Sequence, residues 1–133
     1  MEEVVILSAK RTPIGKLGGD LAGASAVDLG VAAAQAAIKA ARIDPALLNQ
    51  AIFGNVMQAG SGQNVARQIG LKSGMVTSST AMTVNEVCGS GLKAVRLGQA
   101  AIQLGEADAV LVGGTESMSQ VPYYAEAVRS GHK

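Results

Sequence analysis

The chain has almost no aromatic residues, and this scarcity sets the character of any core it can form. Among 133 residues there are two tyrosines, one phenylalanine and no tryptophan. A core of large rings is therefore excluded, although 48% of the residues are hydrophobic. The core must be built from Ala, Val, Ile, Leu and Met, and the seventeen glycines favour close packing between elements.

Neither positive nor negative charge predominates, and the sequence has no long apolar run. The formal net charge is +1 and no cluster of lysine and arginine occurs, so the chain carries no electrostatic footprint for nucleic acid. No apolar run approaches the roughly 20 residues that a membrane-spanning helix needs. The acidic start leads directly into an apolar run, so we do not expect it to be a signal peptide. We therefore expect a cytoplasmic protein with no membrane or nucleic-acid partner.

Cysteine and histidine occur once each, as Cys88 and His132. One cysteine cannot form an internal disulfide, which agrees with a reducing compartment. One histidine argues against a metal site with histidine ligands, and His132 is interpreted as a tail residue. No Cys–His or Ser–His–Asp constellation is complete within this sequence. We therefore expect no metal site with histidine ligands.

The sequence does contain apolar runs that alternate with helical patterns. Ser25 and Asp28 form a capping box before an alanine-rich segment, and Asp44-Pro45 starts a short helix. The expected strands are residues 4–7, 51–56, 80–84 and 109–112, and the expected long helices are residues 26–42, 65–71 and 90–105. This order predicts an α/β fold, a layered and mostly parallel sheet with helices on both faces.

Spacing also predicts which face of the last helix is buried. Leu92, Val95 and Ile102 recur at helical spacing and are expected to form its apolar face. Gly98 and Ala101 are small, and they are expected to let another helix approach closely.

Cys88 stands between an apolar strand and a glycine-rich helix start, in Asn85-Glu86-Val87-Cys88-Gly89-Ser90-Gly91. Without context, a lone cysteine is more often a small buried hydrophobe. Here the arrangement is similar in design to the strand–turn–helix elbow that displays a nucleophilic serine. A helix N-terminus stabilises a thiolate and a developing oxyanion, so we predict that Cys88 is a nucleophile.

Other polar and glycine-rich positions are not interpreted as catalytic or ligand-binding residues. Gly60–Asn64 lacks the spacing of a phosphate-binding loop and the Lys-Ser or Lys-Thr that follows one. Arg67 is interpreted as a solvated or paired charge, and Asp108 and Glu116 as surface or cap residues.

Four ordered blocks give the chain a specific resemblance. They are Ser8–Gly15, Gly54–Val56 with Gly62–Gln68, Asn85–Gly91, and Gly113–Ser119. Together they resemble the N-terminal part of the thiolases, of the acetyl-CoA acetyltransferase (acetoacetyl-CoA thiolase) type. The blocks are spread along almost the whole sequence.

The resemblance implies a reaction and a role for Cys88. The matching cysteine in thiolases takes an acetyl group from acetyl-CoA and passes it to a second acetyl-CoA, giving acetoacetyl-CoA and CoA, or runs the reverse. Coenzyme A thioesters are then substrates, no cofactor is needed, and a homo-oligomer is expected, with residues 80–87 as the pairing edge.

The resemblance also implies that this chain is a truncated N-terminal portion. Residues 1–118 are expected to be an incomplete α/β domain and residues 119–133 the start of an inserted loop region. The family's catalytic histidine and second cysteine have no counterparts here, so we expect the chain alone to be inactive. Two alternatives stay open: a ketoacyl-synthase-type member of the condensing-enzyme superfamily, and a non-catalytic α/β assembly module.

Overall fold

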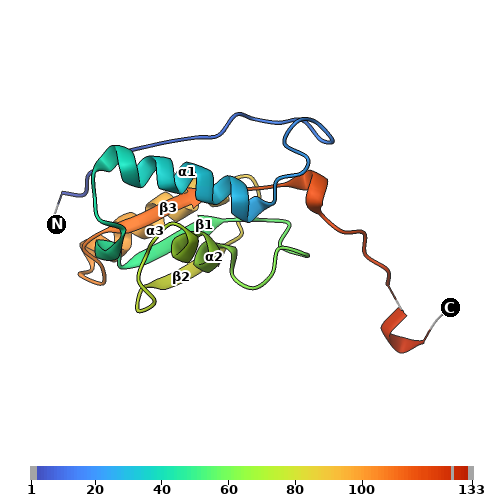
Figure 1. Ribbon diagram of the computed structural model, residues 1–133. Helices are drawn as coiled ribbons and strands as arrows, with labels where there is room; N and C mark the ends of the chain where they lie inside the picture. The colour runs from blue at the N-terminus through green and yellow to red at the C-terminus, as the bar shows by residue number, and fades with distance from the viewer. Residues whose placement is uncertain (1–2, 127, 132–133) are drawn as a thin grey trace.

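A three-stranded parallel sheet forms the centre of the molecule (Figure 1). The computed structural model describes residues 3–126 and 128–131. Strand β1 (Gln50–Gly54) lies between β2 (Thr80–Val84) and β3 (Val110–Gly114), in the order β2-β1-β3. All pairings are parallel and in step, so the three strands end at one edge of the sheet. The predicted parallel sheet is confirmed.

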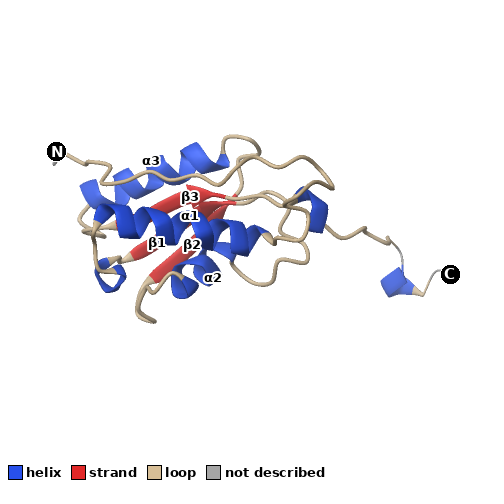
Figure 2. Cartoon of the chain, turned by 45° about the horizontal axis from the view of Figure 1, so that its top comes forward, coloured by secondary structure: helices blue, strands red, loops and turns tan. Residues whose placement is uncertain are grey.

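Helices cover both faces of this sheet, as the sequence predicts. Helix α3 (Ser90–Gln103) packs on one face, and α1 (Ala26–Ala41) and α2 (Val65–Lys72) lie on the other (Figure 2). Each helix links two parallel strands or leads into the sheet, so alternation in the sequence becomes layering in space. The layered α/β architecture is therefore confirmed for the described residues.

Local signals in the sequence fix where α1 begins. The Ser25 hydroxyl accepts a hydrogen bond from the Asp28 N–H at 3.1 Å, and the Asp28 carboxylate accepts one from the Ser25 N–H at 3.2 Å. The helix ends at Ala41, and its C-cap residue Arg42 adopts a left-handed φ of 54°. Asp44 then caps the short 3₁₀ helix Pro45–Leu47, because its carboxylate accepts from the Ala46 N–H at 2.9 Å. Both predicted helix starts are confirmed.

The main core lies between the sheet and the α1–α2 layer. Phe53 of β1 is its single aromatic residue, and it is 4% exposed. The remaining buried members are aliphatic or methionine: Val27, Ala34, Ile38, Leu48, Ala51, Val65, Ala66, Ile69, Met75 and Leu111. Small and branched side chains therefore fill a thin core, as the shortage of aromatic residues requires.

Helix α3 packs on the sheet through small residues, which corrects the predicted apolar face. Its buried members are Ser90, Ala94, Gly98 and Ala101, whereas Leu92 is 78% exposed and Val95 is 37% exposed. A Cβ on Gly98 would lie 2.5 Å from Cγ1 of Val112, so this glycine faces β3 and not another helix. Spacing identified the helix, but close approach to the sheet selected the face with the smallest side chains.

The predicted N-terminal strand is wrong. Val4–Leu7 runs along α1 as an extended segment and forms no strand (Figure 1). Its side chains are largely exposed: Val5 63%, Ile6 77% and Leu7 64%. A groove of about 780 Å³ separates residues 3–10 from α1, β3 and α3. The apolar run has strand-like composition, but it forms no backbone pairing with β3, the edge strand across this groove.

Several element ends differ from prediction by one or two residues. Strand β1 stops at Gly54 and not at Val56, because the following peptide groups turn toward Glu116. Helix α3 stops at Gln103, shortly before Gly105 with its left-handed φ of 72°. Two 3₁₀ turns, Met118–Gln120 and Val128–Ser130, were not predicted.

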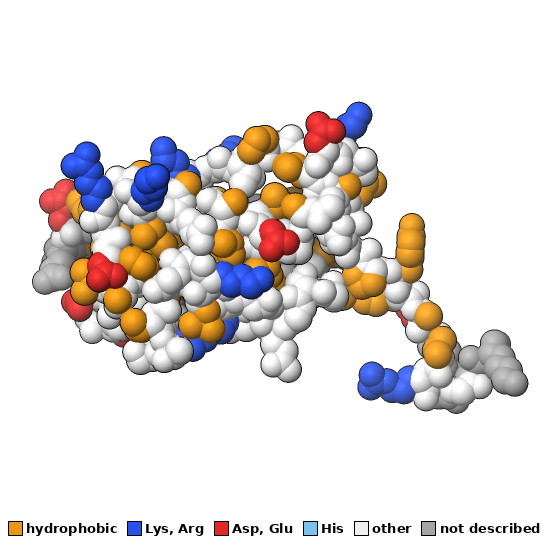
Figure 3. Space-filling model, in the orientation of Figure 1, with side chains coloured by type: hydrophobic (Ala, Val, Ile, Leu, Met, Phe, Trp, Pro, Cys, Tyr) orange, Lys and Arg blue, Asp and Glu red, His pale blue; other side chains and the backbone are white. Residues whose placement is uncertain are grey.

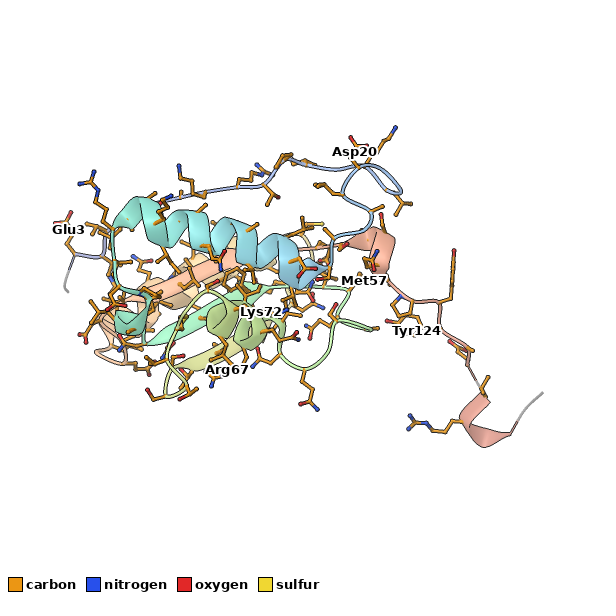
Figure 4. The ribbon with its side chains drawn as sticks, in the orientation of Figure 1. Glu3, Asp20, Met57, Arg67, Lys72 and Tyr124 are labelled. Atoms are coloured by element: carbon orange, nitrogen blue, oxygen red, sulfur yellow. The ribbon has the colours of Figure 1, made fainter. Side chains whose placement is uncertain are left out.

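The C-terminal segment leaves the body of the molecule (Figures 1 and 4). Tyr124, labelled in Figure 4, lies on this segment away from the sheet and is 70% exposed. His132 lies outside the described residues, so its interpretation as a tail residue stays a prediction. Figure 3 shows the lysines and arginines of one face scattered and not gathered into a basic patch. Within the described ranges, no helix combines the length and apolarity needed to cross a bilayer.

Candidate active-site turn

The structure places Cys88 in the turn that joins β2 to α3. Strand β2 ends at Val84 and α3 begins at Ser90, so the cysteine lies just beyond the carboxyl end of the sheet. The thiol is free and the residue is exposed. This is the edge at which parallel α/β sheets bind ligands. The location agrees with the prediction made from the apolar strand and the glycine-rich helix start.

The residue before the cysteine has an unusual backbone. Val87 adopts a φ of 53°, in the left-handed region, where a β-branched side chain is a true outlier. Its N–H donates to Oδ1 of Asn85 at 2.9 Å, and its carbonyl accepts from Oγ of Ser90 at 2.6 Å. Oγ of Ser90 also accepts from the Glu86 N–H at 2.8 Å. Two side chains therefore hold the turn on either side of Cys88.

The start of α3 rests directly on backbone. A Cβ added to Gly54 would lie 2.5 Å from the carbonyl carbon of Ser90 and 2.7 Å from the nitrogen of Gly91. A Cβ added to Gly114 would lie 3.1 Å from Cα of Gly91. Glycine at the ends of β1 and β3 thus makes room for the turn, and a side chain there would push it outward.

Glu116 is more than the surface or cap residue that the sequence suggested. Its carboxylate accepts from Nδ2 of Asn55 at 2.9 Å and from the N–H groups of Val56 and Met57, each at 3.0 Å. These bonds tie the segment after β1 to the segment after β3 beside the active-site turn. Met57 in Figure 4 marks this end of the molecule. Asn55 is 1% exposed, and its Oδ1 has no partner among the described residues.

The block around Gly62–Gln68 supports the sheet and not the thiol. Asn64 caps α2 and binds β2, since its Oδ1 accepts from the Arg67 N–H at 3.1 Å and its Nδ2 donates to the Ala81 carbonyl at 3.0 Å. The Arg67 guanidinium donates to the carbonyls of Ser79 at 2.6 Å and Thr77 at 2.8 Å. Arg67, labelled on α2 in Figure 4, therefore braces the entry to β2 through hydrogen bonds to neutral backbone carbonyls.

Charge around the turn is modest. Nζ of Lys93 and Oε1 of Glu86 form an ion pair of 2.7 Å, and both side chains are more than a third exposed. A pair in that setting contributes at most about 1 kcal/mol and is screened by salt. Gly89 is the N-cap of α3 and supplies no side-chain cap, so the first turn of the helix presents N–H groups and a partial positive charge.

This arrangement suits attack on a carbonyl carbon. An exposed thiol at a helix N-terminus can form a covalent bond to an acyl group, and nearby N–H groups can stabilise the oxygen of the intermediate. Within residues 3–126 and 128–131, no group of three His, Cys, Asp or Glu side chains could hold a metal ion. The described part of the chain also contains no histidine to serve as a base for Cys88.

Comparison with known proteins gives this geometry a family. The family described as Thiolase, N-terminal domain, matches residues 4–133. The chain is 51% identical to the acetyl-CoA acetyltransferase of Escherichia coli strain K12 and 47% identical to that of Cupriavidus necator. Both matches cover 100% of this chain but 34% of the relative.

A solved structure shows the same fold. The Acat5 thiolase of Ascaris suum, crystallised in complex with coenzyme A, matches with a TM-score of 0.89 and 45% sequence identity. The match covers 90% of this chain and 31% of that one. The chain thus spans about a third of the length of the relatives that it matches. On the family match over residues 4–133, the chain belongs to the thiolases and corresponds to their N-terminal domain.

Proposed function

We propose that this chain supplies the acyl-carrying nucleophile, Cys88, of an acetyl-CoA acetyltransferase. One observation carries the proposal: the only cysteine of a thiolase-family chain lies exposed in the turn between β2 and α3. The relatives that match the whole chain are named acetyl-CoA acetyltransferases, which favours acetyl-CoA and acetoacetyl-CoA as substrates.

The proposed chemistry has two balanced steps. In the first, Sγ of Cys88 attacks the thioester carbonyl of acetyl-CoA, the C–S bond to CoA breaks, and the thiol proton passes to the departing CoA sulfur. In the second, a base removes an α-proton from another acetyl-CoA. The resulting carbanion forms a C–C bond to the acetyl carbonyl carbon, the bond from that carbon to Sγ of Cys88 breaks, and the protonated base returns its proton to the thiolate, giving acetoacetyl-CoA and the Cys88 thiol. Splitting one transfer into two steps is the advantage of covalent catalysis.

The base of the second step lies outside the described residues under this proposal. Cys88 would carry the acetyl group, and its backbone N–H would contribute to stabilising the negative oxygen of each tetrahedral intermediate. We therefore expect the 133-residue chain alone to show no measurable condensation or thiolytic cleavage. A homo-oligomeric assembly and a cytoplasmic location stay proposals from the resemblance and the composition.

The division of the chain near residue 118 is also a proposal. Oγ of Ser119 accepts from the Gly18 N–H at 2.9 Å, and the Gln120 side chain donates to the Ala22 carbonyl. The chain leaves the body after these contacts (Figure 1). They favour a boundary a few residues later than 118, with the following residues belonging to a separate region.

The experiment is a chimera in which residues 1–133 replace the matched third of the Escherichia coli acetyl-CoA acetyltransferase. We expect turnover, and peptide mapping after a rapid quench should find one added acetyl group on Cys88. The Cys88→Ala chimera should lose both. If that variant still turned over with retained fold, or if the parent chimera carried its acetyl group elsewhere, the proposal would be wrong.

A matched control separates the thiol from the architecture. The Cys88→Ser chimera keeps the size and hydrogen-bonding capacity of the side chain, so its circular dichroism spectrum and melting temperature should equal those of the parent. Its acetylation should be lost or greatly slowed, because a hydroxyl is a far weaker nucleophile at neutral pH. A non-catalytic assembly module would show no difference in CoA chemistry between any of these proteins.

A further inference from the structure

The strongest unexplained feature of the turn is the strained backbone of Val87. A β-branched residue with a φ of 53° is held in a conformation that costs on the order of 1–3 kcal/mol. Such a residue persists only where its surroundings over-determine it. The residue that follows is Cys88, so the direction of the Val87 peptide sets the direction in which the cysteine leaves the turn.

Two side chains impose this conformation from opposite sides. Oδ1 of Asn85 accepts the Val87 N–H at 2.9 Å, and Oγ of Ser90 donates to the Val87 carbonyl at 2.6 Å. The Ser90 oxygen accepts in turn from the Glu86 N–H at 2.8 Å, so its own orientation is fixed. The Val87 N–H is therefore satisfied by a side chain, and the Val87 carbonyl by the Ser90 hydroxyl together with the Ser90 N–H at 3.2 Å, a backbone bond that Ser90→Ala keeps.

The two contacts differ in how firmly they are anchored. Ser90 is 4% exposed, and its backbone lies against Gly54 at the end of the central strand. Asn85 is exposed and lies on the loop itself. The Ser90 contact thus transmits the position of the sheet to the turn, while the Asn85 contact closes the turn locally.

We propose that Ser90 and Asn85 are positioning residues for Cys88, acting by holding Val87 in the left-handed conformation. Neither side chain is assigned a contact with the substrate. Ser90 is the larger contributor, because the residue itself is buried and its backbone lies against the end of the sheet. The expected effect on acetylation rests on the proposed function of Cys88, but the conformation of Val87 can be measured separately.

The central experiment compares Ser90→Ala with the double variant Ser90→Ala/Val87→Gly in the chimera. Ser90→Ala is expected to slow acetylation of Cys88 by acetyl-CoA by about 10- to 100-fold, the scale of a misplaced reacting group. Glycine reaches a positive φ without steric cost, so Val87→Gly alone should stay within about twofold of the parent. The double variant is expected to recover most of the lost rate. A role of Ser90 in packing alone gives no recovery, and that result would overturn the proposal.

A structural readout on the 133-residue chain is independent of activity. The ¹³Cα and ¹³Cβ shifts of Val87 and its H–N–Cα–H coupling report the left-handed conformation. They should move toward averaged values in Ser90→Ala and less so in Asn85→Ala. Unchanged Val87 shifts in both variants would also overturn the proposal.

Ser73 supplies a matched control. It is buried at 7% exposure, and its Oγ has no partner among the described residues, so Ser73→Ala removes a buried hydroxyl without breaking a bond. Its acetylation rate should stay within about twofold of the parent. If Ser90→Ala fails to fold, the exposed Asn85→Ala replaces it in the same pairing with Val87→Gly.

Failure of this proposal differs from failure of the proposed function. If the parent chimera takes no acetyl group on Cys88, the function is wrong, and the Val87 shifts still decide whether Ser90 and Asn85 hold the turn. If the parent is acetylated and Ser90→Ala reacts at the parent rate, the function stands and the positioning role falls.

Discussion

The two sides of β3 are built in opposite ways. On the side of β1, strands pair in step, α3 lies against backbone at Gly54 and Gly114, and Glu116 ties the strand ends together. On the other side, a groove of about 780 Å³ separates β3 from the extended residues 3–10. On the side of β1, the packed side, backbone groups are hydrogen-bonded and apolar surface is covered within the chain. On the side of the groove, they are not.

The comparison shows which side of β3 controls the position of Cys88. The turn that carries Cys88 is attached to the packed side, through Ser90 against Gly54 and Gly91 against Gly114. Its placement therefore depends on contacts that a single added methyl group disturbs. The N-terminal segment keeps apolar side chains exposed, and changes in it should have little effect on the described fold.

The largest effect on stability should be the difference between two Ile→Ala substitutions, one in the sheet and one in the N-terminal segment. Ile52 in the central strand is 1% exposed, and Ile6 in the N-terminal segment is 77% exposed. Ile52→Ala should lower the free energy of unfolding by about 2–5 kcal/mol because it leaves a cavity. Ile6→Ala should stay within about 0.5 kcal/mol. Urea unfolding followed by circular dichroism measures both.

Equal losses for Ile6→Ala and Ile52→Ala would break the comparison. They would mean that the N-terminal segment is packed as firmly in solution as the central strand, and that the groove is closed there. A larger loss of unfolding free energy for Ile6→Ala would mean that the main stabilising contacts lie on the groove side of β3.

A smaller effect is expected from Gly54→Ala. The new Cβ would lie 2.5 Å from the Ser90 carbonyl carbon, so α3 must shift outward, at a cost of about 1–3 kcal/mol. Gly23→Ala is the control, since nothing lies within 4 Å of its added Cβ. It should leave stability unchanged or raise it by up to about 1 kcal/mol, because alanine restricts the unfolded chain. Thermal unfolding of both variants tests this, and a tolerated Gly54→Ala would show that the turn does not rest on the sheet.

Much of the arrangement of strands and helices could be predicted from sequence, because its signals are local. The capping box at Ser25 and Asp28, the Asp44-Pro45 start and the strand–turn–helix pattern around Cys88 each lie within a few residues. The packing of α3 could not be predicted in the same way. Leu92 and Val95 have helical spacing, but approach to β3 favoured Gly98 and Ala101, and that choice depends on residues far away in the chain.

The remaining errors also concern distant partners. The apolar Val4–Leu7 has strand composition, yet a strand needs a neighbour, and composition does not say whether one is present. Glu116 resembles many surface carboxylates in sequence, and only the fold brings it to the N–H groups of Val56 and Met57, about sixty residues earlier. Its position directly after the Gly113-Gly114 strand end was the available signal, since groups at the carboxyl edges of parallel strands meet.

The smallest expected effect is a pH dependence at the start of α1, away from both sides of β3. The hydroxyl and N–H of Ser25 donate to the Asp28 carboxylate and hold the pKa of that carboxyl below its ordinary value. The folded pKa is thus lower than the unfolded one. The stabilisation is present above the unfolded pKa, near 4, and is lost as the pH falls through the folded pKa.

The melting temperature of Asp28→Asn should be below that of the parent at pH 6, and this gap should close below pH about 4. A gap that stayed constant from pH 6 to pH 3 would mean that the Asp28 charge does not stabilise the helix start, and that shape alone makes the cap.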